Sequence, residues 1–360
     1  MNVVPDVSGD RPTATPPATD GTLGVYTTLR LGGPAGTLTA VTEPDKAVAA
    51  VRAAAANGQP VLVLAGGSNV VIGDAGFPGT VLLLRTRGVR VVAREAGHVV
   101  VRVAAGEPWD TFVTEAVANG WSGVECLAGI PGSAGATPIQ NVGAYGQEVA
   151  HTIAAVHAYD READAVRAMT PEQCEFAYRS SVFKHSDRWV VLEVDFRLSL
   201  SPESEPIRYA ELARQLGVET GDRVPLDRAR ETVLKLRAGK GMVLDADDKD
   251  TWSVGSFFTN PVLSAADWAQ LTTMASPPHW PGDDGMVKVP AAWLIEHAGF
   301  PKGYAGKDVA ISSKHTLALT NRGGGTTRAL LDLAREIRDG VQDRFGVELH
   351  PEPVLVNCTF

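Results

Sequence analysis

The sequence predicts an α+β protein with mixed rather than strictly parallel sheets. Short apolar runs typical of strands, such as residues 61–64, 81–84 and 99–103, alternate with short helical patterns along the chain. A hydrophobic content of 44% with 21% charged residues is ordinary for a globular protein. A chain of 360 residues is long enough for two or three domains that share a sizeable core.

The N-terminal third begins with residues 1–20, which are rich in Pro, Thr and Asp, and we expect a disordered tail there. Order should begin within residues 22–31. Residues 44–57 have the propensity of a helix and are followed by Gly58, a frequent helix stop. Residues 109–118 form an amphipathic pattern, which predicts a second helix.

The middle of the chain predicts mainly strands. Residues 153–159 and 163–169 are typical of a strand pair, and residues 189–198 predict a long strand. Between them, residues 171–176 predict a short helix. Residues 225–237 predict a charged helix with a proline near its first turn.

The C-terminal third follows the polar segment 239–251, which has the composition of a linker or lid and marks a domain boundary. Beyond it, the patterns predict helices at 265–274, 290–298 and 326–345 and strands at 308–312, 316–320 and 348–356. The last helix is the clearest in the chain. Its apolar stripe is typical of a helix packed on a core and consists of Leu330, Ala334, Ile337, Val341 and Phe345.

Composition excludes several classes of function. A formal charge of −9 argues against a broad nucleic-acid or anionic-membrane surface. The three cysteines, Cys126, Cys174 and Cys358, are scattered and suit a reducing compartment, and the eight histidines form no metal-binding pair. The sequence has neither a membrane-spanning apolar run nor the blocks of a signal peptide. We therefore expect a cytoplasmic protein without a metal.

The stretch from Gly129 to Gly146 is rich in glycine and proline and carries no formal charge. Neither a helix nor a strand tolerates that composition, so the segment must be irregular. Glycine lets backbone N–H groups approach a ligand closely, which favours a loop that cradles a cofactor. A loop packed on apolar neighbours is the alternative from this stretch alone. The turn at residues 66–69 allows the same two interpretations, a phosphate nest or a plain tight turn.

Five motifs in order carry a resemblance to a known family. They are G-G-S-N-V (66–70), I-P-G-S-A-G-A-T-P-I-Q-N-V-G-A-Y-G (130–146), Y-R-S-S-V-F-K (178–184), G-S-F-F-T-N-P (255–261) and P-E-P-V (351–354). The series resembles UDP-N-acetylenolpyruvoylglucosamine reductase, also called UDP-N-acetylmuramate dehydrogenase. The resemblance covers nearly the whole ordered chain.

The resemblance implies two α+β domains that hold FAD, in the manner of the vanillyl-alcohol oxidase flavoproteins, and a third α+β domain that closes over the substrate. The boundaries it suggests are a tail at 1–20, FAD-binding subdomains at 21–88 and 89–222, a connector helix and linker at 223–251, a substrate-binding domain at 252–346, and a strand at 347–360 that returns to the FAD domains.

The implied reaction belongs to peptidoglycan synthesis. NADPH reduces a non-covalent FAD and leaves, and the enolpyruvyl ether of UDP-N-acetylglucosamine then takes its place in one shared cleft. A monomer is expected, with no nucleic-acid or membrane partner. No G-x-G-x-x-G fingerprint is present, so NADPH has no dedicated domain.

Three residues match the family's catalytic positions. Arg179 would face the substrate carboxylate, Ser256 would deliver a proton, and Glu352 would lie beside the developing charge. Each alone has a plainer interpretation: a surface arginine, a turn serine and a solvated glutamate. Only the ordered series of motifs favours catalysis. We expect Phe257 and Phe258 in the core and Lys184 facing solvent.

The match to the family is less complete at the substrate-binding positions than at the catalytic positions. The expected FAD contacts are Gly66, Ser68, Asn69, Pro131, Gly132, Ser133, Gln140, Asn141, Gly143 and Tyr145. The expected substrate contacts are Tyr209, Lys240, Asn260, Trp280, Lys302 and His315. Trp280 stands where the family usually has a tyrosine, and His315 where it has a glutamine. The segment between Lys240 and Ser256 is longer than usual and acidic.

Two rival functions remain open from the sequence. An oxidase of the same superfold would share the FAD site but would not need Arg179, Ser256 and Glu352. A non-catalytic sugar-nucleotide binding protein would be colourless.

Overall fold

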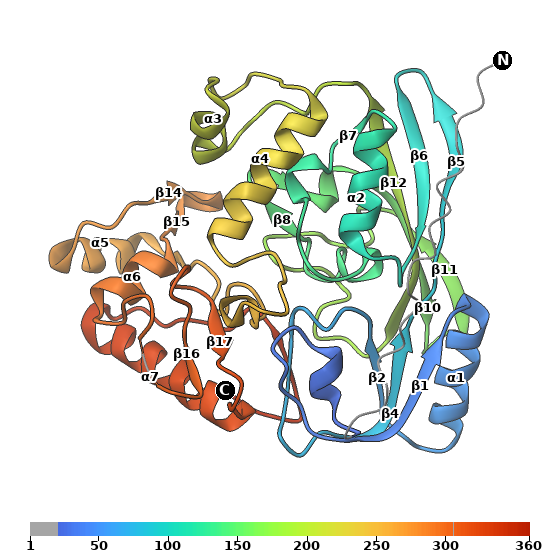
Figure 1. Cartoon of the computed structure of the whole chain (residues 1–360), viewed down its shortest axis with the longest axis horizontal. Coiled ribbons are helices and arrows are strands. Elements are labelled where there is room, and N and C mark those ends of the chain that lie inside the picture. The colour runs from blue at the N-terminus through green and yellow to red at the C-terminus, as the bar shows by residue number, and fades with distance from the viewer. Residues whose placement is uncertain (1–20, 305) are drawn as a thin grey trace.

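The computed structural model describes residues 21–304 and 306–360, so the expected tail at 1–20 lies outside the described residues. The first layer is a parallel sheet in the order β1-β4-β2, formed by β1 (Ala35–Val41), β2 (Val61–Leu64) and β4 (Phe77–Leu84). Helix α1 (Pro44–Ala56) lies beside this sheet (Figure 1). Its alanine-rich apolar stripe buries Val48 and Val51 with Leu82 and Leu84 of β4.

The second layer is a larger antiparallel sheet in the order β11-β10-β12-β6-β5, with β7 paired to the end of β12. Its strands are β5 (Val89–Glu95), β6 (His98–Ala104), β7 (Trp121–Ser122), β10 (Ile153–Asp160), β11 (Ala165–Met169) and β12 (Trp189–Leu200). Helix α2 (Trp109–Ala118) comes after β6 in the chain, and helices α3 (Ala210–Leu216) and α4 (Leu226–Gly239) come after β12. One buried cluster joins this sheet to α1, α2 and α4, so the two sheets share a core.

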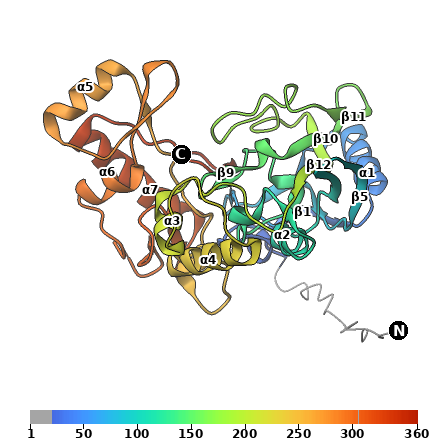
Figure 2. The same cartoon turned by 90° about the horizontal axis from the view of Figure 1, so that it is seen from above.

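The third part forms a separate lobe in Figure 2. Its elements are β13 (Val262–Leu263), α5 (Ala265–Met274), β14 (Trp280–Pro281), β15 (Val287–Lys288), α6 (Ala291–His297), β16 (Val309–Ile311), β17 (Leu319–Asn321) and α7 (Thr327–Phe345). The predicted stripe of α7 is buried throughout, together with Phe257 and Phe258. Mixed parallel and antiparallel sheets confirm the predicted α+β class.

The C-terminal strand β18 (Val354–Val356) pairs in parallel with β3 (Val70–Ile72), which follows the glycine-rich turn at 66–69. Just before β18, the backbone N–H of Glu352 donates to the carbonyl of Phe257 at 2.8 Å. The end of the chain therefore lies between the first layer and the third part. The domain boundaries themselves stay predictions.

Three sequence expectations differ from the structure. Residues 171–176 form turns rather than a helix, and Glu175 adopts a φ of 49°, which a right-handed helix cannot accommodate. The strand expected at 348–356 is limited to β18, because Pro351 and Pro353 have no N–H for a ladder. The strand expected at 316–320 begins only at Leu319. Strand β5 was not predicted, because six of its seven residues are exposed and the strand therefore lacks a buried apolar face.

Candidate active site

A cavity of about 620 Å³ lies where the three parts meet. The glycine-rich loop, the turn at 66–69, the segment 253–256 and Glu352 all line it. Strand β2, residues 183–191 of the second layer, Arg179 and Arg237 also line it. Segments distant in the sequence thus contribute to one cavity.

The two glycine-rich segments approach each other inside this cavity. A Cβ added to Gly66 would meet the Cα of Gly132 at 2.6 Å, so glycine is required for the contact. The Ser133 hydroxyl is buried and has no hydrogen-bond partner among the described residues. A buried unsatisfied hydroxyl is costly, which indicates a ligand that supplies the missing partner. A neutral, glycine-lined wall with a free hydroxyl fits the phosphates of FAD.

The proposed catalytic groups meet at this cavity. The Arg179 Nε lies 3.4 Å from Glu352 Oε1, and its guanidinium also donates to the carbonyl of Gly143 at 2.8 Å. Arg179, Glu352 and Ser256 all line the cavity. Ser256 is brought there by a β-bridge to Ala318. A guanidinium, a carboxyl group and a hydroxyl around one space can bind a carboxylate and move a proton.

Burial raises the pKa of Glu352 above its usual range, against the opposing charge of Arg179. A carboxyl group with a raised pKa can hold a proton and donate it. Lys184 contributes to the same field: it is half-buried, lines the cavity, and donates from Nζ to the carbonyl of Arg179 at 3.0 Å. The expectation that Lys184 faces solvent is therefore wrong. Lys288 of β15 lies 3.4 Å from the ring centroid of Tyr178, on the same side of the site.

The backbone is strained at this site. Arg179, Asn141 and Tyr145 have φ values of 54°, 44° and 49°, in the left-handed region that non-glycine residues adopt rarely. Each such residue costs about 1–3 kcal/mol, so the surrounding contacts must hold it. The Asn141 side chain does this, since its Nδ2 donates to Glu148 Oε2 at 2.9 Å and its Oδ1 accepts from the N–H of Ala150 at 3.1 Å.

Eight of the ten residues expected to contact FAD line the cavity: Gly66, Ser68, Asn69, Pro131, Gly132, Ser133, Gln140 and Gly143. Asn69 and Gln140 are hydrogen-bonded to each other, which links the two segments. Asn141 and Tyr145 do not line it. Asn141 is buried with its hydrogen bonds made inside the fold, and Tyr145 points instead toward Tyr209, with ring centroids 5.4 Å apart.

The six residues expected to bind substrate do not line this cavity, although Lys240 directly precedes Gly241, which does. The Lys240 ammonium lies 5.7 Å from the Tyr145 ring and pairs with Glu211 at 2.6 Å. Burial lowers the pKa of His315 to about 4, helped by the charges of Lys240 and Lys302. The His315 ring is therefore neutral at pH 7, in a strongly positive environment.

The remaining two expected substrate residues differ in their surroundings. Asn260 accepts from the N–H of Ala291 at 3.0 Å, which caps α6. Trp280 in β14 is 50% exposed. An exposed aromatic ring is available to stack on a base.

Sequence reasoning missed Arg237, which lines the cavity and is 9% exposed. Its Nη2 donates to the carbonyl of Met242 at 2.8 Å, and its Nε has no hydrogen-bond partner in the part of the chain that the structure describes. Among the described residues no carboxylate lies within ion-pair distance of it. A buried unpaired guanidinium is unfavourable without an anion, so Arg237 fits a phosphate or another anionic group in the cavity. The signal available in the sequence was its position three residues before Lys240, a predicted substrate-binding residue.

Within residues 21–304 and 306–360, no group of three or more His, Cys, Asp or Glu side chains could hold a metal ion. None of the helices there combines the length and apolar character needed to cross a bilayer.

The comparisons with known proteins agree with this geometry. Residues 36–168 match an FAD binding domain, and residues 247–356 match the C-terminal domain of UDP-N-acetylenolpyruvoylglucosamine reductase. The fold and the site define an FAD-dependent oxidoreductase.

Individual relatives cover almost the entire chain. The UDP-N-acetylenolpyruvoylglucosamine reductase of Salinispora arenicola is 64% identical over 340 residues, covering 92% of this chain and 94% of the relative. The enzyme of that name from Thermobifida fusca is 54% identical, covering 93% and 96%. The crystal structure of the Thermus caldophilus enzyme is 26% identical, with a TM-score of 0.65 and coverage of 93% and 97%. The chain belongs to the UDP-N-acetylenolpyruvoylglucosamine reductase family.

Proposed function

We propose that this protein reduces the enolpyruvyl group of UDP-N-acetylglucosamine-enolpyruvate to give UDP-N-acetylmuramate, with NADPH as the source of hydride. Bound FAD supplies the chemistry of hydride acceptance from NADPH and hydride delivery to the vinyl carbon remote from the ether oxygen. The family membership and the FAD-binding segment support this reaction.

The chain's own residues have defined tasks in this reaction. The Arg179 guanidinium binds the substrate carboxylate and stabilises the negative charge that builds there as hydride arrives. Ser256 gives a proton to the other vinyl carbon. Glu352, whose pKa is raised by burial, donates a hydrogen bond to the same developing enolate.

The meeting of Arg179, Ser256 and Glu352 at the FAD cavity is the observation that carries the proposal. An oxidase passes its electrons to oxygen and would not need these three side chains. A non-catalytic binding protein needs neither the set nor the cavity. The arrangement therefore favours reduction of a substrate that bears a carboxylate.

The nucleotide end of the substrate is assigned to the rim cluster of Tyr209, Lys240, Lys302 and His315, with Asn260 and Trp280 beside it. Positive charge gathered around a neutral His315 supports binding of a diphosphate. NADPH would use the same cleft in turn. We also propose that the protein is a monomer and that it is cytoplasmic, the latter because both reactants are soluble nucleotides.

An anaerobic visible spectrum tests the function. The purified protein should be yellow, bleach with NADPH, and regain its colour when the enolpyruvyl substrate is added. Free UDP-N-acetylglucosamine is the control and should leave the flavin bleached. Return of colour at a comparable rate with air alone would indicate an oxidase, and a colourless protein would indicate a binding protein.

A further inference from the structure

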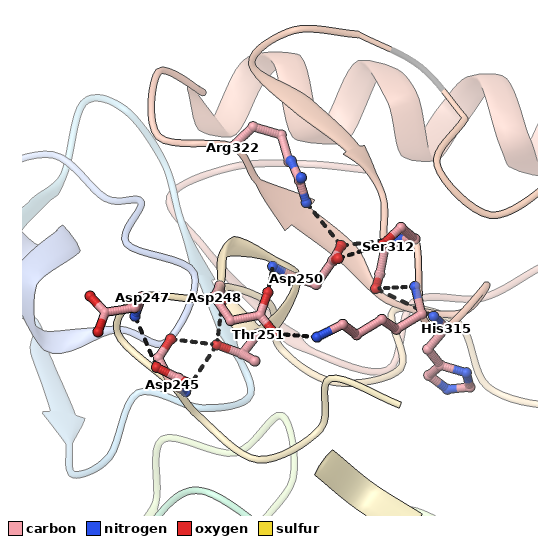
Figure 3. A network of polar contacts seen from close by, with 10 residues as sticks. Asp245, Asp247, Asp248, Asp250, Thr251, Ser312, His315 and Arg322 are labelled. Carbon is pink, nitrogen blue, oxygen red and sulfur yellow. Dashed lines mark hydrogen bonds and ion pairs between the residues drawn. The ribbon is translucent and has the colours of Figure 1, made fainter. Parts of the chain in front are cut away.

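The acidic connector, residues 245–251, joins α4 to the segment that carries Ser256 and has no task in the proposed reaction. It is folded rather than loose. The Thr251 hydroxyl accepts from the N–H of Asp245 at 3.0 Å and donates to the Asp245 carbonyl at 2.7 Å. Figure 3 shows Asp250 beside Ser312 and Arg322 of the third part, with Asp245 and Asp247 on the other side of Thr251.

Asp250 is the buried acid of the connector, with a side chain that is 8% exposed. Its carboxylate accepts from the N–H of Ser313 at 2.9 Å, from the Ser313 hydroxyl at 2.6 Å and from Arg322 Nη1 at 2.8 Å. Burial opposes ionisation, but these donors hold the pKa of Asp250 below its usual range. The group is therefore charged at neutral pH, and its three hydrogen bonds are charge-assisted.

Asp250 fixes the turn at residues 312–315. Within that turn, the Ser312 hydroxyl accepts from the N–H groups of Lys314 at 3.0 Å and His315 at 3.3 Å. The Lys314 ammonium pairs with Asp248, so the connector contacts the turn twice. The carboxylates thus determine where His315 lies.

The same turn is bonded to the loop that bears Lys302. The N–H of Gly303 donates to the carbonyl of Ser312 at 3.3 Å. Displacement of the turn would therefore shift Lys302 as well as His315. Both belong to the positive rim cluster, and neither is attached directly to the connector.

We propose that Asp250 is a positioning residue for the binding of a nucleoside diphosphate. Through Ser313 it holds the 312–315 turn, and so positions His315 and Lys302. Asp250 itself does not line the cavity. The inference rests on the proposed function, because the ligand is the UDP moiety of that substrate.

The test compares two variants that remove the same charge from the same connector. Asp250→Asn loses the buried, bonded carboxylate, and the new amide cannot accept from all three donors. Asp247→Asn is the matched control, since Asp247 is exposed and its carboxylate makes no hydrogen bond with the described residues. The probe is UDP, titrated into the FAD-loaded enzyme by calorimetry.

Asp250→Asn should weaken UDP binding about tenfold, the scale of one charge-assisted contact network. The substrate concentration for half-maximal flavin reoxidation should rise by the same factor, while the limiting rate stays within about threefold. Bleaching at saturating NADPH should be unchanged. Asp247→Asn should match the unmodified enzyme in every measurement.

A second variant covers failure of Asp250→Asn to fold. Ser313→Ala removes one donor to Asp250 from an exposed residue and should weaken UDP binding severalfold. Unchanged UDP affinity in Ser313→Ala, or equal affinity in the two aspartate variants, would refute the proposed role of Asp250. Either result would leave the proposed function intact. A fall in the limiting rate with normal UDP affinity would also refute the role of Asp250. If the unmodified enzyme neither binds UDP nor reacts with the substrate, the proposed function itself fails.

Discussion

Replacement of Glu352 distinguishes hydrogen-bond donation from proton transfer at the site. Glu352→Gln retains the shape and an N–H donor, whereas Glu352→Ala loses both. The Glu352 side chain is 14% exposed, and its Oε1 lies 3.4 Å from Arg179 Nε. Either change therefore affects a contact from which most water is excluded. If Glu352 donates a hydrogen bond, Ala should slow substrate-driven flavin reoxidation about 10²-fold, and Gln by less than about tenfold.

The magnitude follows from the surroundings of the carboxyl group. Removal of one buried donor aimed at a developing charge costs about 2.7–4 kcal/mol, which corresponds to 10²–10³ in rate. Stopped-flow absorbance of the flavin under anaerobic conditions measures both half-reactions separately. Bleaching by NADPH should be normal in both variants. Glu348→Gln is the control, because Glu348 is exposed four residues earlier on the same segment.

Two results would refute this reasoning. If Glu352→Gln is as slow as Glu352→Ala, an acidic proton rather than a hydrogen bond is required. If either variant loses FAD, Glu352 supports the fold, since its backbone also pairs with Phe257.

Three further predictions follow from other contacts. Ser256→Ala should slow reoxidation by about 10²-fold or more and leave bleaching by NADPH unchanged, because hydride arrival needs no proton from Ser256; equal slowing of both half-reactions would make the residue structural. FAD should be non-covalent, so acid precipitation should release all colour; His185 lines the cavity, and a yellow pellet lost in His185→Ala would locate a covalent link. Asp195 is buried, and although burial opposes ionisation, Arg102 and His157 lower its pKa to about 2. Because the folded pKa is lower than the unfolded one, this group stabilises the fold by about 2 kcal/mol above pH ~4, and the contribution is lost as pH falls toward 2. Asp195→Asn should therefore lower the thermal midpoint strongly at pH 7 and much less near pH 2; an equal shift at both values would contradict the linkage.

Much of the local structure followed from the sequence. The limits of β2, α2 and α5 agree with the predicted runs, because period and stop signals are local properties. The stripe of α7 was equally clear. The short helix expected at 171–176 failed for a related reason: six residues carry little periodic information, and hydrogen bonds of Cys174 to Thr170 and Pro171 close a turn instead.

The sequence also determined the candidate groups of the site. Gly66 and Gly132 stood out because only glycine permits such close backbone approach, and that requirement is visible in composition. The order of the motifs identified Arg179, Ser256 and Glu352. It could not show that these three share a cavity, since they lie far apart in the chain.

Only the tertiary structure decided which charges are buried and what they face. Lysine is usually exposed at the surface of a protein, yet the fold places Lys184 at the cavity wall. Arg237 is one of several arginines in a charged helix, and only burial leaves it without a carboxylate. The connector was predicted to be part of a polar linker or lid, and only the structure places Asp250 against Ser313. Electrostatic environment depends on distances through space and on exclusion of water, and neither quantity is encoded by residues adjacent in the sequence.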